Sequence, residues 1–174
     1  MAKEKSVKFR SEIISSPEMS GWHLLLIPAK HGNKVEKKNG SRRVVCTING
    51  TETFQCALMP HGEDFMIIVN KVKRTRLGVV AGDKLSVELQ ADESKYGLPM
   101  PKELREVLKQ DKEGNRLFHA LTAGKQRTIL YYIGKAKDID RRIHMALVVI
   151  EHLKDNDSKI IYPKLAEGLK RPIF

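Results

Sequence analysis

Apolar and polar residues alternate with a period of two through the first half of the chain, which is typical of β-strands. The alternation is cleanest from Lys84 to Gln90, and a further strand is predicted over residues 7–14. Two continuous apolar runs, residues 21–28 and 65–69, predict strands buried on both faces, with Trp22 in the core. We therefore expect an all-β unit, a small β-barrel, over residues 6–94.

One hairpin can be predicted down to its register. Asn49-Gly50 between two alternating segments is the strongest short hairpin signal. A three-residue loop pairs Ile48 with Glu52 and gathers the apolar side chains on one face, whereas a two-residue loop mixes them with polar ones. Cys46 and Cys56 are then diagonal neighbours about 7–8 Å apart. Disulfide Cα atoms lie about 4.4–6.8 Å apart, so we expect two free thiols.

Two polar segments interrupt the strands. Ala29 to Arg42 has the glycine and asparagine content of a loop, and it is basic. Lys71 to Leu77 is predicted to form a short helical turn that Gly78 ends. Ala81-Gly82-Asp83 then turns the chain into the last strand of this half.

After a linker at residues 91–100 the hydrophobic period changes to 3.6, which predicts three or four helices over residues 99–155. Thr122 can cap one helix, and Asp138 or Asp140 can open the last long one. The tail, residues 156–174, is predicted either to dock back or to be disordered. The last long helix carries one apolar stripe that we expect to be packed, formed by Ile139, Ile143, Ala146, Leu147, Ile150 and Leu153.

The net charge of +11 is compatible with a polyanionic partner, nucleic acid included, and equally with the spare lysines that many soluble proteins carry. Most of the excess lies in two segments, Lys30 to Arg43 and Lys71 to Arg76. We expect the first segment to fold over the same target as the second. The alternative is a solvated rim whose lysine stems cover apolar ends of the barrel. The candidate anion- or nucleic-acid-binding residues are Lys71, Lys73, Arg74, Arg76, Lys30, Lys34, Lys37, Lys38, Arg42 and Arg43.

The sequence also bears on whether a nucleic acid would be bound by base stacking or by readout of base edges. Aromatic residues make up 6% of the chain and do not interleave with the basic run, which argues against a stacking platform for single strands. Readout of base edges requires side chains such as Asn, Gln or Arg, and Asn70 and Arg74 are the best candidates.

No motif predicts a metal, a cofactor or a catalytic group. The six histidines lack His-Glu-x-x-His spacing, and no Cys-x-x-Cys pair occurs. His144 and His152 lie eight residues apart on one predicted helix, and we expect ordinary surface or rim histidines. Gly124-Lys125 lacks the glycine spacing and the preceding strand of a phosphate-binding loop.

Several motifs in order resemble known families. The first half resembles a small β-barrel domain of unknown function, through Gly21-Trp22, Pro28, Val44 to Gly50 and Gly82-Asp83. The second half resembles the YdeI/OmpD-associated, or bacteriocin-protection, family. Its matching residues are Leu98-Pro99-Met100-Pro101, Leu117-Phe118-x-x-Leu121-Thr122, Tyr131-Tyr132-Ile133-x-x-Ala136-Lys137 and Arg142-Ile143.

The resemblance implies an α+β fold, a double-split β-barrel of the AbrB/MazE-like class followed by a helical bundle. That class includes transcription regulators and antitoxins. Members of the second family carry a Thr-Arg pair where this chain has Asp138-Ile139-Asp140, so no role of that arginine carries over. The resemblance implies no agreed biochemical activity.

We therefore expect a non-catalytic binding or regulatory module for an anionic ligand. One alternative is a sequence-tolerant DNA-binding protein of AbrB-like type, and another is an enzyme with its site in the cleft between barrel and helices. No apolar run approaches the roughly 20 residues of a membrane span, and no apolar stretch follows the charged N-terminus. We expect a cytoplasmic monomer with no membrane partner and no cofactor.

Overall fold

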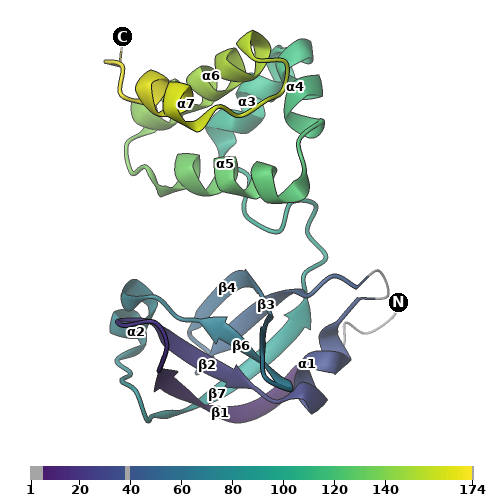
Figure 1. Cartoon of the computed structure of the whole chain (residues 1–174), viewed down its shortest axis with the longest axis vertical. Coiled ribbons are helices and arrows are strands. Elements are labelled where there is room, and N and C mark those ends of the chain that lie inside the picture. The colour runs from purple at the N-terminus through teal and green to yellow at the C-terminus, as the bar shows by residue number, and fades with distance from the viewer. Residues whose placement is uncertain (1–5, 38–39, 174) are drawn as a thin grey trace. The chain divides into compact units, whose positions relative to one another are not determined.

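The computed structural model describes residues 6–37 and 40–173, and the chain is α+β (Figure 1). It divides into two compact units, one ending at Glu93 and one beginning at Ser94. The first unit holds the sheet and two short helices, and the second holds the remaining helices. Within the described residues, no helix is both long enough and apolar enough to cross a bilayer.

The first unit is a seven-stranded sheet that curls into a half-barrel. Its order is β4-β3-β7-β1-β2-β6-β5, and every neighbouring pair is antiparallel. The strands are β1 (Val7–Ser15), β2 (His23–Ile27), β3 (Arg43–Ile48), β4 (Glu52–Ala57), β5 (Met59–His61), β6 (Asp64–Ile68) and β7 (Lys84–Ala91).

Strand β1 is long enough to serve two ladders. Its first part pairs with β7, from Val7 opposite Leu89 to Glu12 opposite Lys84, and its end pairs with β2, where Ile13 faces Leu25. The edge strands β4 and β5 are consecutive in the chain and are joined by a single buried residue, Leu58.

The inner face of the half-barrel is the alternating apolar set that the sequence predicts. Leu85, Val87 and Leu89 of β7 are buried, and so are Val44, Cys46 and Ile48 of β3. Burying an aliphatic side chain of this size contributes roughly 1.5–3 kcal/mol. These two strands therefore supply a large share of the unit's stability.

The register predicted for the hairpin is confirmed. Ile48 faces Glu52, Cys46 faces Phe54, and both cysteines are free. Asn49 and Gly50 have φ angles of 52° and 68°, a left-handed conformation that these two residue types tolerate best. The Asn49 side chain also accepts a hydrogen bond from the backbone of Ser86 at 2.9 Å. The turn is thereby fixed to the neighbouring strand.

Two predictions for this unit are wrong. Trp22 is 44% exposed, because β2 begins at His23 and Trp22 still belongs to the preceding turn, where its N–H bonds the Met19 carbonyl. Residues 29–35 form the helix α1 (Ala29–Val35) and not a loop. Asp64 accepts the Ala29 N–H at 2.8 Å, and Gly32 lies so close to Phe65 that a Cβ would approach the ring to 2.4 Å. Contacts distant in sequence therefore fold this helix.

The second unit is helical. Over residues 99–155, where three or four helices were predicted, it contains four: α3 (Lys102–Gln110), α4 (Lys112–His119), α5 (Ala123–Lys135) and α6 (Ile139–Asp155). A further helix, α7 (Tyr162–Leu169), lies in the tail. The predicted caps are confirmed, since Thr122 accepts from Lys125 N and Asp138 from Arg141 N. The tail contains α7, which packs along α6. Phe118, Ile133 and Leu153 are fully buried at the centre.

The packing of α6 differs from its predicted stripe. Ile139, Ile143 and Leu147 are exposed. Because α3, α4, α5 and α7 all pack on α6, the buried arc is wider than one stripe and is displaced from it. The same displacement buries His144 and His152, so they are not surface histidines as predicted.

Candidate functional site

The predicted cations that the structure describes, all but Lys38, belong to two segments that leave one ladder at opposite ends. Strand β2 runs antiparallel to β6, with Leu24 opposite Ile68 and Ile27 opposite Phe65. Helix α1 follows the Ile27 end of this ladder, and α2 (Lys71–Leu77) follows the Ile68 end. Figure 1 shows the two helices on opposite sides of the half-barrel. The sequence analysis expected the two basic segments to fold over the same target. The structure instead places helices α1 and α2 apart (Figure 1).

Helix α2 has well-defined ends: the stop at Gly78 was predicted, and the cap at Asn70 was not. The Asn70 side chain accepts from Lys73 N at 2.9 Å, and Gly78 ends the helix with a φ of 64°. Leu77 packs against the core of the half-barrel and anchors the helix. Helix α2 packs beside β4, which is an edge strand of the sheet.

The cations of α2 differ in how much they interact within the protein. Among the described residues, Lys71 makes no hydrogen bond, ion pair or ring contact, and it is exposed. The Lys73 ammonium lies 4.6 Å from the centroid of the Phe54 ring, a cation–π contact that leaves its charge uncompensated. Arg76 has an exposed side chain and lies 3.4 Å from Glu52. We call Lys71, Lys73 and Arg76 the α2 cations.

The two candidates for base readout are used inside the protein. The amide oxygen of Asn70 caps α2, and Arg74 donates to the Val69 carbonyl at 2.6 Å. Both side chains hold the β6–α2 junction in shape. A ligand that touches α2 therefore meets lysine and arginine charge without the two polar groups expected to read bases.

The cations near α1 are more strongly compensated. Lys37 pairs with Glu93 at 3.2 Å, and Arg42 pairs with Glu36 at 3.4 Å. Arg43 lies half-buried in β3 and is already engaged by its surroundings, and Lys38 lies outside the described residues. Only Lys30 and Lys34, among the described cations of this segment, are exposed with no ion pair to a carboxylate.

Three titratable groups of the first unit, Cys46, Cys56 and His31, have pKa values shifted toward their uncharged forms. Burial raises the pKa of the Cys46 thiol and raises that of Cys56 to about 12, so neither forms a thiolate at neutral pH. Burial, and then the charges of Lys30 and Lys34, lower the pKa of His31, whose ring stacks on Phe9 at 4.3 Å. These groups contribute packing and no nucleophile.

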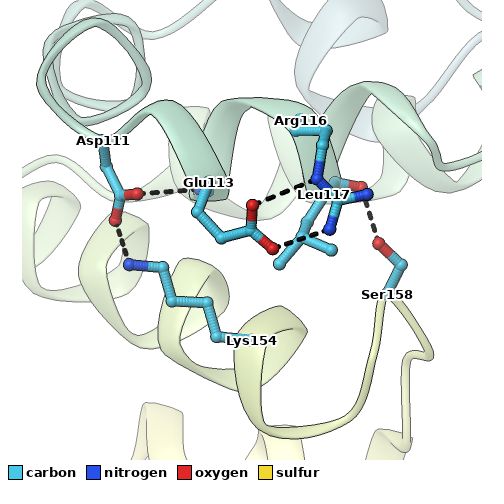
Figure 2. A network of polar contacts seen from close by, with 7 residues as sticks. Asp111, Glu113, Arg116, Leu117, Lys154 and Ser158 are labelled. Carbon is cyan, nitrogen blue, oxygen red and sulfur yellow. Dashed lines mark hydrogen bonds and ion pairs between the residues drawn. The ribbon is translucent and has the colours of Figure 1, made fainter.

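A network of polar contacts in the helical unit joins α4, α6 and the residues that follow α6 (Figure 2). One oxygen of Asp111 accepts from Gly114 N at 2.8 Å and thereby caps α4, while the other pairs with Lys154 of α6. Hydrogen bonding from Lys154 is the main cause of the lowered pKa of Asp111. Glu113 pairs with Arg116, and Ser158 donates to the Leu117 carbonyl at 3.0 Å. Every member has a partner, so the cluster joins helix ends and presents no free acid or base.

Neither of the buried histidines of α6 lies in a cluster of potential metal ligands among the described residues. Nε2 of His152 accepts from Ile161 N at 3.0 Å, at the start of α7. Across residues 6–37 and 40–173, no three His, Cys, Asp or Glu side chains approach one another closely enough to hold a metal ion.

One feature of the helical unit has no signal in the sequence. A largely apolar cavity of about 270 Å³ lies among α5, α6 and α7. Its walls come from segments up to 41 positions apart, from Thr128 to Leu169, so only the docking of α7 brings them together.

Two family models match the chain. Residues 9–89 match a domain of unknown function (DUF1905), and residues 98–156 match the family described as Bacteriocin-protection, YdeI or OmpD-Associated. The fusion inferred from the motifs is thereby confirmed. No curated protein matches the chain. The α2 cations lie inside the first match, and α7 lies beyond the end of the second.

Proposed function

We propose that this chain, a DUF1905 domain followed by a YdeI/OmpD-associated domain, is a non-catalytic binding module whose α2 cations bind the phosphate backbone of duplex nucleic acid. The observation that carries the proposal is the charge of α2. Four of its seven residues are cations, none is acidic, and among the described residues it forms an ion pair only through Arg76 and Glu52.

Electrostatics favours a dense anion over a single one. A seven-residue helix is about 10 Å long, and duplex DNA carries one charge per about 1.7 Å of its axis. The α2 cations can therefore neutralise several phosphates at once and release their counterions. Free carboxylates on separate small molecules offer no such density.

The proposed binding is tolerant of sequence. Asn70 and Arg74 are the two side chains of this segment best suited to base edges, and both are held in hydrogen bonds that shape the junction. Contacts to phosphate position a protein without reading bases. We therefore expect similar affinity for duplexes of unrelated sequence.

The proposal also extends to the barrel class. We assign the half-barrel to the double-split, AbrB/MazE-like class. Two observations support this assignment: β1 changes partner between Glu12 and Ile13, and the edge strands β4 and β5 follow each other with one residue between them.

The test is fluorescence anisotropy of a labelled 20-base-pair duplex titrated with the full chain. Three phosphate contacts predict a slope of log affinity against log salt of about −2.7, which is roughly a 40-fold loss between about 50 and 200 mM salt. The triple variant Lys71→Gln, Lys73→Gln, Arg76→Gln should abolish most of the binding and flatten the slope.

Matched variants separate the α2 surface from bulk charge. The control variant Arg105→Gln, Lys109→Gln, Lys112→Gln also removes two lysines and one arginine, but from exposed positions of the helical unit, and it should bind as the wild type does. Lys30→Gln, Lys34→Gln should also keep most of the affinity. Absence of saturable binding at low salt, or an equal loss in all three variants, would refute the proposal.

A further inference from the structure

The helical unit contains a cavity that the proposed nucleic-acid binding does not use. It is bounded by α5, α6 and α7, and its volume is about 270 Å³. Its floor is buried core, including Ile129, Ile133 and Val149. The remaining lining residues are Thr128, Tyr132, Met145, Ile160, Tyr162, Leu165, Ala166 and Leu169.

The chemistry of this cavity is apolar inside and polar at its mouth. The lining carries no Lys, Arg, Asp, Glu or His side chain. Tyr132 and Tyr162 are 55% and 57% exposed although both line the cavity, so they stand where it opens to solvent. The Thr128 hydroxyl donates to the Gly124 carbonyl at 3.1 Å, which leaves its oxygen able to accept a hydrogen bond.

Size limits the ligand. An apolar cavity of about 150 Å³ holds one benzene ring and otherwise stays dry. By that measure, 270 Å³ accommodates roughly ten non-hydrogen atoms. That volume is too small for a peptide helix and too apolar for a nucleotide or a sugar phosphate.

We propose that this cavity binds a small, uncharged, mainly apolar molecule with one hydrogen-bonding group, of the size of an alkylphenol. The apolar body fills the space against Ile129, Ile133 and Val149. The hydroxyl lies at the mouth, within the region of the tyrosine hydroxyls and Thr128. Burial of apolar surface supplies the affinity, and the polar mouth sets the orientation.

Helix α7 is the wall that makes the cavity. It contributes Tyr162, Leu165, Ala166 and Leu169. Its start is held by the hydrogen bond from Ile161 N to His152, and its end by Arg141, which donates to the Leu169 carbonyl at 2.6 Å. A bound molecule therefore contacts α7 and α5 together, and it should stabilise the docked position of α7.

The experiment uses the full chain and 4-propylphenol, which has ten non-hydrogen atoms, followed by isothermal titration calorimetry and by amide chemical shifts. We expect saturable binding with a dissociation constant of about 0.1–1 mM. Phenol, which lacks the propyl chain, should bind at least about tenfold more weakly. Shifts should concentrate on the residues that line the cavity.

Ala166→Trp tests the location, because Ala166 lines the cavity from an exposed position of α7 and the indole should fill the space. It should weaken 4-propylphenol binding at least about tenfold. Ala123→Trp, an exposed alanine outside the lining, should bind as the wild type does. If Ala166→Trp does not fold, Ala166→Phe provides a smaller aromatic side chain to occupy the cavity. No saturation up to about 10 mM phenol derivative, or equal binding by a folded Ala166 variant, would overturn the proposal.

Discussion

Two glycines in the helical unit predict opposite effects of the same substitution. Gly114 lies buried in α4, and a Cβ there would stand 2.4 Å from Ile150 Cγ2 of α6 and 3.1 Å from Asp111 Cγ. Gly124 lies near the start of α5, and a Cβ there would meet no atom within 4 Å. Alanine should therefore destabilise the unit at position 114 and stabilise it at position 124.

The magnitudes follow from two opposing terms. Alanine gains up to about 1 kcal/mol over glycine in a helix. At position 114 carbon atoms that normally stay about 3.5–4.0 Å apart would have to separate by more than about 1 Å, and such overpacking costs about 1–3 kcal/mol or more. Asp111, which the new Cβ would crowd, also caps α4 and pairs with Lys154. Displacing its side chain would therefore cost about 1 kcal/mol of capping free energy. We expect Gly114→Ala to lose about 1–3 kcal/mol and Gly124→Ala to gain up to about 1 kcal/mol.

The assay is urea unfolding of the full chain followed by far-ultraviolet circular dichroism, with thermal melts in parallel. For a unit of this size, 1 kcal/mol corresponds to a shift of roughly 4–8 °C in Tm. Ile150→Ala removes the crowded methyl, so the double variant with Gly114→Ala should be at least about 0.5 kcal/mol more stable than the sum of the single effects. Equal stability of the two glycine variants, or strict additivity with Ile150→Ala, would show that α4 and α6 are not in this contact.

Three further predictions concern other parts of the molecule. Burial first, and then the charge of Lys164, lower the pKa of His152, so the fold favours the neutral ring. The contribution of this ring to stability should be present above about pH 6.5 and be lost as the pH falls further, so His152→Gln should flatten the fall in Tm between about pH 7 and 5; an unchanged fall in that variant would contradict the assignment. Cys46 is buried and Cys56 is half-buried, and desolvation raises the pKa of both thiols. Both should react with an alkylating reagent many-fold more slowly in the native chain than in urea, and comparable rates in the two states would contradict this protection. Asn70→Ala removes the cap of α2, at a cost of about 1 kcal/mol, and should weaken binding to all duplexes alike; a change confined to particular base sequences would instead assign Asn70 to base readout.

Local patterns predicted the parts of the fold that local physics determines. The hairpin register is fixed because a shift of one residue would turn Val44, Cys46 and Ile48 to solvent. The bounds of α2 follow from a side chain able to cap at Asn70 and a glycine able to adopt positive φ at position 78. In both places one short segment contains all the determinants.

The predictions failed where contacts with a segment distant in the sequence determine the local structure. Helix α1 is supported by Asp64, which accepts the Ala29 N–H, and by Phe65, which packs on Gly32, and neither contact is visible in the composition of residues 29–42. The stripe of α6 was placed by period alone, but four neighbouring helices bury a wider arc and leave Ile139, Ile143 and Leu147 outside it. The apolar cavity depends in the same way on the docking of α7.

The candidate anion-binding surface of α2 shows that the number of cations differs from the number that are unpaired and can contact a ligand. In the helical unit Arg142 pairs with Glu103, and Lys154 with Asp111, so these cations hold helices together and are poor contacts for a ligand. In α2 the only carboxylate partner among the described residues is Glu52, and Lys71 has none. A sequence lists cations of both kinds alike, because ion pairs such as Arg76–Glu52 join positions far apart in the chain. If net charge alone drove binding, the matched triple variants of the two units would lose equal affinity; because partners decide which charges are free, we expect the loss only for α2.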